Sequence, residues 1–382
     1  MRRHDVLIVG GGPAGLALAV ALADSGLDIV LADARTPAAV AADARVLALS
    51  YGTRLTLERL GAWDGLPVTP IETIHVSQQG GFGRTLIRAA DHDVPALGYV
   101  TPAGALARTL RAAVERAGIT VCDETTVDGI VPGSADVVAT LHRAGTHAPE
   151  TLAARLLACA ECRADDTAVR GRDYGQHALI AFTSPRGGHH GRAYERFTPT
   201  GPVALLPCAE RYAVVHVVAD TEADALLALD DAAYLARLQA CFGRRVALET
   251  VSARQRHPLA LRYRREPVGR RTVWLGNAAQ TLHPVAGQGF NLALRDVWAL
   301  ADTLSRHGGD PGQAALLAAY ARARTLDRAG AIGFTDTLVR LFSRDSAPLR
   351  GLRGAGLLAL DLVPPLRGFV ARRMMFGARA WP

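Results

Sequence analysis

The chain has 382 residues, a formal net charge of +7, and 49% hydrophobic against 21% charged residues. That length is enough for two domains, each with its own core. No apolar run reaches the roughly 18 to 20 residues that a membrane-spanning helix needs. All 43 basic residues are arginine, which excludes chemistry that depends on a lysine amine, such as a pyridoxal Schiff base or a Walker-type phosphate loop.

Composition argues against several other classes of function. The arginines are scattered rather than clustered, so nucleic-acid binding is not predicted. The five cysteines form no regular framework, and Cys159 and Cys162 have CxxC spacing without a second pair or histidine partners. We therefore expect neither disulfides nor a metal site. The N-terminal apolar run breaks at Gly10, which favours a first strand in a cytoplasmic protein over a secretion signal.

The first elements follow the order of a dinucleotide-binding fold. Residues 5–9 predict a strand, 10–15 a glycine turn, 16–25 a helix, and 28–32 a second strand that ends at Asp33. Glycines at the GxGxxG positions let backbone N–H groups approach a pyrophosphate, and an acid after the second strand can bind a ribose. The candidate cofactor residues here are Gly10, Gly12, Ala14, Gly15 and Asp33.

Further along, residues 101–117 predict an amphipathic helix and 118–121 a strand. Alternating segments over about 177–220 indicate an antiparallel sheet. Residues 272–275 predict another strand, which is followed by a helix from about Phe290. The elements thus predict an α/β fold, a Rossmann-like dinucleotide-binding domain with an inserted antiparallel sheet and a helical C-terminus. The family resemblance described next implies that these are an FAD-binding domain and a substrate domain. The predicted segments are 1–75, 101–176 and 266–342 for the FAD-binding domain, 76–100 and 177–265 for the substrate domain, and 343–382 for the C-terminal helices.

Residues 276–292 read GNAAQTLHPVAGQGFNL. They resemble the second flavin-contacting motif of the group A flavoprotein monooxygenases, the para-hydroxybenzoate hydroxylase family, in the form typical of ubiquinone-biosynthesis hydroxylases. The resemblance implies FAD contacts from Gly276, Asn277, Pro284, Gly287, Gln288, Gly289 and Asn291. Asn277 replaces the family's usual acid, as it does in the ubiquinone branch. His283 and Pro284 would lie near the flavin ring, although a structural hydrogen bond explains His283 equally well.

Other stretches resemble the same family. Residues 43–50 look like its arginine segment, with Arg45 along the FAD, and residues 98–100 precede a helix that carries Arg108, a further implied FAD contact. Residues 194–198, 201–207 and 375–377 also match. The mid-chain Ala-Asp-Gly element is altered to Ala160-Glu161-Cys162, so either Glu161 or Asp165 or Asp166 supplies its acid.

The resemblance implies an enzyme in which NADH or NADPH reduces FAD, O2 forms a flavin C4a-hydroperoxide, and a phenol is hydroxylated without a catalytic triad. Within the ubiquinone branch the motifs are most similar to the 2-polyprenyl-6-methoxyphenol hydroxylases, so the expected substrate is a prenylated phenol. The alternatives are a flavin-binding member of a biosynthetic assembly without turnover, and an FAD hydroxylase, reductase or halogenase acting on another substrate. The halogenase is disfavoured because its tryptophan motif and catalytic lysine are absent.

The C-terminal segment combines apolar and basic residues. Leu366, Phe369, Val370, Met374, Met375 and Phe376 lie beside Arg372 and Arg373. This pattern suggests peripheral contact with the inner membrane or with partner proteins of ubiquinone biosynthesis, and simple helix packing is the alternative.

Overall fold

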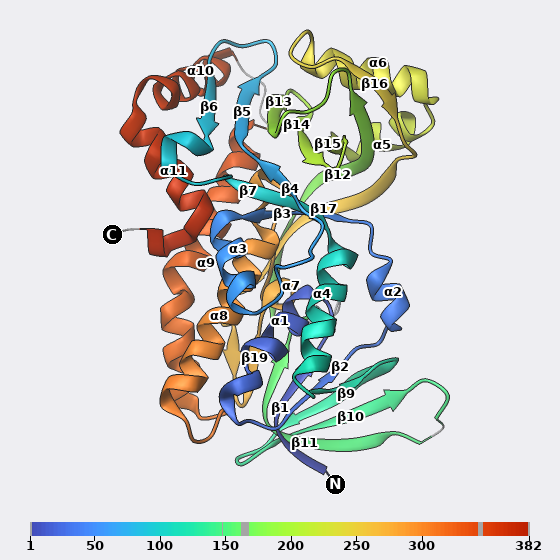
Figure 1. Ribbon diagram of the computed structural model, residues 1–382, viewed down its shortest axis with the longest axis vertical. Coiled ribbons are helices and arrows are strands. Elements are labelled where there is room, and N and C mark those ends of the chain that lie inside the picture. Colours follow the sequence, from blue (N-terminus) through green and yellow to red (C-terminus); the bar gives the residue numbers. More distant parts are fainter. Residues whose placement is uncertain (1, 147, 162–167, 343–346, 381–382) are drawn as a thin grey trace.

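The computed structural model describes residues 2–146, 148–161, 168–342 and 347–380. Figure 1 shows two stacked halves joined by long strands. The lower half is built on parallel strands in the order β19, β11, β1, β2, β8. Their bounds are β1 Arg2–Val9, β2 Ile29–Ala32, β8 Thr120–Cys122, β11 Glu150–Cys159 and β19 Thr272–Trp274.

The burial of the central strand β1 shows why both faces of this sheet are covered. Val6, Leu7 and Ile8 are fully buried, with Val6 and Ile8 on one face and Leu7 on the other. A parallel strand covered on both faces needs such an unbroken apolar run. One face is covered by α1 (Pro13–Ala21), α4 (Ala103–Arg116) and α8 (Gly289–His307), and the other by the hairpin of β9 (Thr125–Pro132) and β10 (Val137–Arg143).

The first helix differs from its prediction. It begins at Pro13, inside the glycine turn, and ends at Ala21, after which a 3-10 turn spans Ala23–Ser25. Proline is well suited to a first helical position because its ring fixes φ and its missing N–H is not needed there. The helix therefore points its N-terminus at the glycines directly.

The upper half is a nine-stranded sheet in the order β20, β17, β12, β15, β14, β13, β5, β6, with β16 beside β12. Its pairs are antiparallel except that β13 and β5 run parallel. The bounds are β5 Thr73–Gln78, β6 Arg84–Arg88, β12 Val169–Pro185, β13 Arg192–Thr198, β14 Gly201–Cys208, β15 Arg211–Ala219, β16 Leu248–Val251, β17 Gln255–Arg264 and β20 Gln280–Thr281. The parallel pair arises because β5 comes from a distant part of the chain and joins the edge of the later strands.

A three-stranded sheet lies between the halves. Strand β7 (Gly98–Pro102) pairs antiparallel with both β3 (Val46–Ser50) and β4 (Thr69–Ile71). The predicted segment boundaries at 75/76 and 176/177 fall inside β5 and β12, so continuous strands cross them. The segment bounds stay a prediction.

The C-terminal helices close one side of the molecule (Figure 1). They are α9 (Ala314–Phe342), α10 (Ala347–Leu362) and α11 (Pro364–Phe376), followed by a 3-10 turn at Gly377–Ala380. The Leu86 N–H on edge strand β6 donates to Asp361 Oδ1 at 3.2 Å, so α10 covers that edge. Among the described residues no single helix is long and apolar enough to cross a membrane. Only the pair Pro348–Leu362 and Pro364–Phe376, bent by 97°, has that combined length and composition.

The remaining elements are short or lie at the periphery. They are α2 Pro37–Ala41, α3 Tyr51–Arg59, η2 Ala89–His92, α5 Asp220–Leu227, α6 Asp231–Phe242, β18 Val268–Gly269, α7 Gly276–Ala279 and η3 Val285–Gly287.

Candidate functional site

The glycine turn before α1 is tightly closed on one side and open on the other. Gly10 has φ +104°, and a Cβ added at Gly15 would lie 1.8 Å from the Gly10 carbonyl oxygen. Only glycine fits both positions. A Cβ at Gly12, in contrast, would meet only Arg35 Nη2, at 3.7 Å, and no side chain caps the first turn of α1. The helix N–H groups beside Ala14 therefore face a space that could receive an anion.

Asp33 lies at the end of β2, directly beside this turn. It is 2% exposed and accepts the Gly11 N–H, the Arg35 N–H (2.7 Å) and Arg35 Nη2 (2.7 Å). Burial raises the pKa of Asp33, but the hydrogen bonds and charge of Arg35 outweigh it, and the pKa lies below its ordinary value. Asp33 is thus a fixed carboxylate at physiological pH.

Glu161 approaches the same turn from β11. Its Cγ lies 2.3 Å from where a Gly10 Cβ would be, and its Oε1 accepts from Arg35 Nη2 at 2.7 Å. Burial and the nearby Asp33 charge raise the pKa of Glu161, and Arg35 opposes them. Cys162, Asp165 and Asp166 lie outside the described residues, so the choice between Glu161 and these acids stays open.

The second motif packs against the first. A Cβ added at Gly276 (φ +51°) would lie 3.3 Å from the Cβ atoms of Ala14 on α1 and Ala293 on α8. Asn277 is exposed beside it. Gly289 opens α8 with nothing within 4 Å of an added Cβ, and no side chain caps that helix. Two uncapped helix N-termini thus come from motifs more than 260 residues apart in the chain.

Asn291 holds the loop before α8 in place. Its Oδ1 accepts the Ser50 N–H (2.8 Å) and the Thr53 hydroxyl (2.7 Å), and its Nδ2 donates to the Ala48 (2.9 Å) and Gly287 (2.8 Å) carbonyls. The side chain is 2% exposed and has no hydrogen-bonding capacity left. The structure makes the Asn291 side chain a clamp between β3 and η3, and its contact with FAD stays a prediction.

His283 and Pro284 lie at the start of the same loop. Burial lowers the pKa of His283 to about 4, so its ring is neutral at pH 7. Its Nδ1 accepts the Val285 N–H at 3.2 Å, which leaves the proton on Nε2. That buried Nε2 has no hydrogen-bond partner among the described residues. His283 thus makes a structural hydrogen bond that orders the loop. Its Nε2–H is still available to a ligand near the loop, as expected for a residue beside the flavin ring.

Arg45 and Arg108 lie apart from these contacts. The Arg45 side chain is 58% exposed and pairs with Asp43 at 2.6 Å. Arg108 Nη1 donates to the Ala41 carbonyl at 2.9 Å, which ties α4 to the end of α2. In the described part of the chain, neither side chain hydrogen-bonds to the glycine turn itself, although the charges of Asp43 and Arg45 act on each other and on Arg35 beside that turn.

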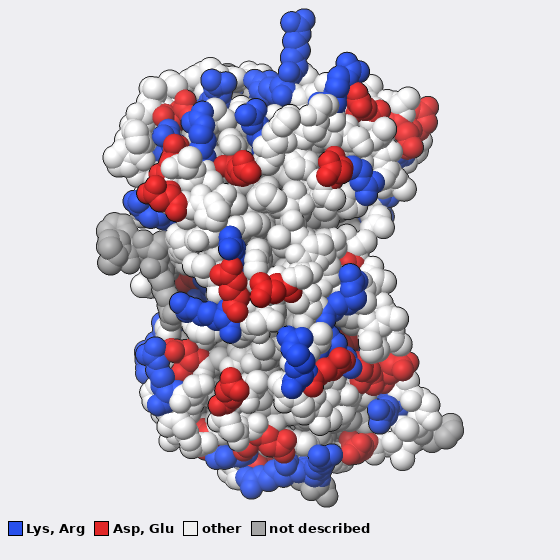
Figure 2. All heavy atoms as spheres, viewed as in Figure 1, with Lys and Arg blue, Asp and Glu red and all other residues white. Residues whose placement is uncertain are grey.

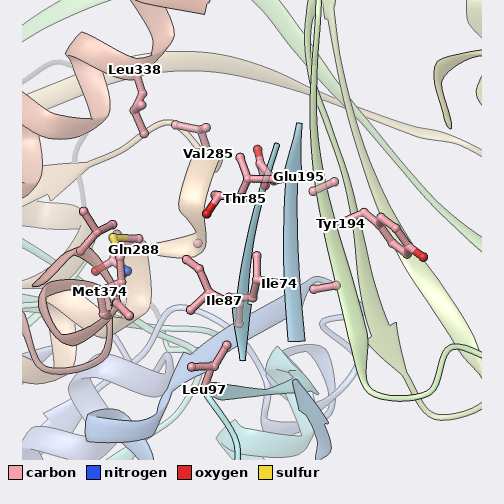
Figure 3. Close-up of a pocket in the computed structure, with 18 of the residues that line it drawn as sticks. Ile74, Thr85, Ile87, Leu97, Tyr194, Glu195, Val285, Gln288, Leu338 and Met374 are labelled. Atoms are coloured by element: carbon pink, nitrogen blue, oxygen red, sulfur yellow. Dashed lines mark hydrogen bonds between the residues drawn. The ribbon is translucent and has the colours of Figure 1, made fainter. Parts of the chain in front are cut away.

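The loop of the second motif also forms one wall of a large apolar cavity of about 570 Å³. The other walls come from the upper sheet and the C-terminal helices, as Figure 3 shows for Ile74, Ile87, Leu338 and Met374. From the motif, Pro284, Val285, Gly287, Gln288 and Asn291 line it. This is the size and character of a site for a largely apolar small molecule.

Comparison with known proteins decides the family. A family model described as FAD binding domain matches residues 3–332. The chain is 34% identical to the ubiquinone hydroxylase UbiL of Rhodospirillum rubrum, over 97% of this chain and 89% of that protein. It is 27% identical to the ubiquinone hydroxylase UbiM of Neisseria meningitidis, over 97% and 84%. The chain belongs to this family of FAD-binding hydroxylases.

Solved structures agree on the fold of the family. The p-nitrophenol 4-monooxygenase PnpA of Pseudomonas putida DLL-E4 superposes with a TM-score of 0.80, covering 99% of this chain and 100% of that one at 16% identity. The family resemblance and the α/β fold class predicted from the motifs are therefore confirmed, and the chain is an FAD-dependent monooxygenase of the ubiquinone-biosynthesis branch.

The described residues fit the family's cofactor. The open space at Gly12, the two uncapped helix N-termini and the buried Asp33 carboxylate suit a dinucleotide, and the unpaired His283 N–H adjoins the cavity loop. FAD bound there would extend from the glycine turn to the loop of residues 284–289.

Sequence reasoning missed three side chains at these sites. Arg35 follows Asp33 by two residues, and that spacing after a strand could have indicated the ion pair. Thr85 and Glu195 face the cavity. Glu195 lies in a stretch that resembles the family, but only the strand pairing shows which face of the sheet it occupies.

Proposed function

We propose that this protein hydroxylates a prenylated phenol of ubiquinone biosynthesis, with FAD as cofactor, O2 as oxidant and NADH or NADPH as electron donor. The observation that carries the proposal is the apolar cavity, because its wall includes the loop of the second flavin motif. A ring substrate in that cavity would lie against the flavin, and the cavity's aliphatic lining suits a prenyl chain.

Different residues would bind different parts of FAD. In this proposal Gly10, Gly12, Ala14 and Gly15 surround the pyrophosphate, and Asp33 accepts the ribose hydroxyls. Asn277 would hold the ribityl chain, while Arg45 and Arg108 lie along the outer edge. Gly276, Pro284, Gly287, Gln288 and Gly289 would shape the flavin site, with Asn291 acting through the loop that it fixes.

FAD held by these residues would supply the redox chemistry between the nicotinamide donor and O2. The chain's own task is to orient the phenol and to keep water away from that reaction. The cavity serves the second task because its lining is almost entirely aliphatic and aromatic.

We further propose that the α10–α11 corner rests on an anionic membrane surface. Leu352, Leu358, Leu362, Val363, Leu366 and Phe369 are each at least 40% exposed there. Val370 and Met374 on α11 face the cavity instead, and Met375 is 3% exposed in a core cluster. One side of these helices thus meets solvent while the other lines the cavity, which would let a lipid-borne phenol enter without crossing water.

Burial of apolar side chains, rather than a basic patch, would carry this contact. On the face shown in Figure 2, basic and acidic side chains alternate without a large basic patch. Arg372, on the exposed side of α11, could contact lipid phosphates.

Leu362→Asp combined with Phe369→Asp should weaken binding to vesicles containing anionic lipid at least fivefold. Leu326→Asp, on α9 and 79% exposed in the native chain, is the matched control. Equal vesicle binding by the wild type, the double variant and the Leu326→Asp control would refute the membrane proposal.

The main test is turnover by the FAD-loaded protein. We expect a short-chain prenylphenol to stimulate oxidation of NADH or NADPH and to yield a hydroxylated product. Bound FAD without product, even when partner proteins of ubiquinone biosynthesis are supplied, would instead support the alternative of a non-catalytic flavoprotein. The altered Ala160-Glu161-Cys162 element is the observation that suggested this alternative.

A further inference from the structure

The cavity wall carries a row of side chains from neighbouring strands. Glu195 on β13 pairs with Val76 on β5, which pairs with Thr85 on β6, and on the other side with Ala204 on β14. Residues in register on adjacent strands project from the same face of a sheet. All four line the cavity, so two polar side chains stand in an otherwise apolar row.

These two polar groups lack partners in the part of the chain that the structure describes. No hydrogen bond or ion pair joins the Glu195 carboxylate to any other described residue. The Thr85 hydroxyl is likewise buried without a partner among the described residues. The other polar lining groups are engaged: Ser50 with Thr53, Asn291 with β3 and η3, and Arg353 Nη1 with the Phe342 carbonyl.

The neighbouring residue shows that this orientation is a property of the strand. Tyr194 points to the opposite face, where its ring packs against Phe242. Figure 3 shows Tyr194 turned away from the cavity while Glu195 and Thr85 lie on its wall. Period-two alternation along β13 therefore fixes Glu195 toward the substrate space.

We propose that Glu195 binds the ring hydroxyl of the phenol substrate and accepts its proton, with Thr85 as a second hydrogen-bond partner for the ring's oxygen substituents. The proposal rests on the hydroxylase function proposed above. In this step the substrate O–H bond breaks, an O–H bond forms to a Glu195 Oε atom, and the electron pair stays on the ring oxygen. No oxidation state changes, and the resulting phenolate is the electron-rich ring that an electrophilic oxygen requires.

The surroundings suit a base that works near neutrality. Burial raises the pKa of Glu195 to about 7, which lies closer to the pKa of a phenol than an ordinary carboxyl does. Among the described residues of the lining, the only other charged group is Arg353. On the elements packed against β13, His75 and Arg196 point to the opposite face, Arg84 and Arg88 are exposed on β6, and His283 is neutral above pH 4.

The test compares a phenol bearing one prenyl group with its methyl ether, which cannot donate a hydrogen bond. Equilibrium dialysis against the FAD-loaded protein at pH 8 should show about tenfold tighter binding of the phenol, since a hydrogen bond to a carboxylate is stronger than a neutral one. This preference should weaken as the pH falls through about 7. Glu195→Gln should reduce it to within twofold at all pH values.

Controls separate a specific role from general damage. Glu195→Asp should retain part of the preference, and Glu210→Gln, which removes an exposed carboxylate from the turn between β14 and β15, should retain all of it. The proposal is overturned if the wild-type protein shows no preference for the phenol, or if Glu195→Gln keeps it.

Turnover measured on the same proteins distinguishes the two proposals. If wild type hydroxylates the phenol, kcat/KM at pH 8 should fall about 100-fold in Glu195→Gln, and the rise of rate through pH 7 should disappear. Unchanged turnover in Glu195→Gln would refute the role of Glu195 as proton acceptor and leave the hydroxylase function standing. A phenol preference without any product would leave the binding role standing and refute the hydroxylase function.

Discussion

The crevice formed by the glycine turn, Asp33, Arg35 and Glu161 differs from the apolar cavity in how its polar groups are paired. In the crevice, Asp33 accepts hydrogen bonds from Gly11 and Arg35, and Arg35 also pairs with Glu161. In the cavity, the Thr85 hydroxyl has no partner among the described residues. No described side chain pairs with the Glu195 carboxylate, and burial alone shifts its pKa. The crevice is thus preorganised by the protein itself, whereas the cavity keeps hydrogen-bonding capacity for a ligand.

The crevice and the cavity also differ in how their empty space is formed. The crevice depends on the absence of side chains, because Gly15 lies against the Gly10 carbonyl. The cavity depends on side chains that fill only its rim and leave about 570 Å³ inside. Substitutions in the crevice should therefore act through steric overlap and lost hydrogen bonds, and substitutions in the cavity through charge.

The largest effect is expected for Gly15→Ala. The added methyl group would overlap the Gly10 carbonyl oxygen, so α1 and the turn could not both keep their positions. We expect a loss of about 4 kcal/mol or more in the free energy of unfolding, and little retained FAD. Denaturant unfolding and flavin absorbance after gel filtration measure both. Gly333→Ala on α9, which meets nothing within 4 Å, should be neutral or slightly stabilising.

Asn291→Ala tests the clamp on the loop before α8. It would leave the Ser50 N–H and the Ala48 and Gly287 carbonyls without their partner in a buried place. We expect a destabilisation of about 3 kcal/mol, measured by urea unfolding. Asn277→Ala, in the same motif but exposed, should change stability by less than about 0.5 kcal/mol. Equal effects from the two substitutions would show that Asn291 is not a clamp.

Glu195→Gln should alter stability in a pH-dependent way, independently of activity. Because its folded pKa is raised to about 7, the folded protein retains a proton that the unfolded chain loses above pH about 4.5. Wild-type stability should therefore fall as pH rises from about 4.5 to 7 and then stay level. The variant should lack this fall and gain about 2 kcal/mol at pH 8. Thermal unfolding of wild type and Glu195→Gln over this pH range measures the difference in stability. Glu210→Gln should show the pH dependence of the wild type.

The smallest effect on stability is expected for Arg45→Gln. Its ion pair with Asp43 is on the surface, where such pairs contribute less than about 1 kcal/mol. If Arg45 lies along the FAD, the variant should nevertheless release flavin faster, as followed by fluorescence of the freed cofactor. Flavin release at the wild-type rate would remove Arg45 from the proposed cofactor site.

Much of this protein could be predicted from its sequence because the relevant signals are local. The run Val6-Leu7-Ile8 predicted a strand, and the spacing of Gly10, Gly12 and Gly15 before an acid indicated a dinucleotide site. The second motif, residues 276–292, fixed the family. Each of these depends on the covalent order of residues within about 35 positions, and the comparisons confirmed the family and fold class that they indicated.

Tertiary structure decided what local order could not. The parallel pairing of β13 with β5 joins residues about 120 positions apart and aligns Glu195 with Thr85 on one wall. Packing of α11 turns Val370 and Met374 into the cavity and leaves Phe369 outside. The Asn291 side chain clamps the loop because β3 passes close beside it, a role that the motif alone did not indicate. The sequence thus determined the family, its cofactor and the elements, whereas long-range strand pairing and helix packing determined the substrate cavity and its one free carboxylate among the described residues.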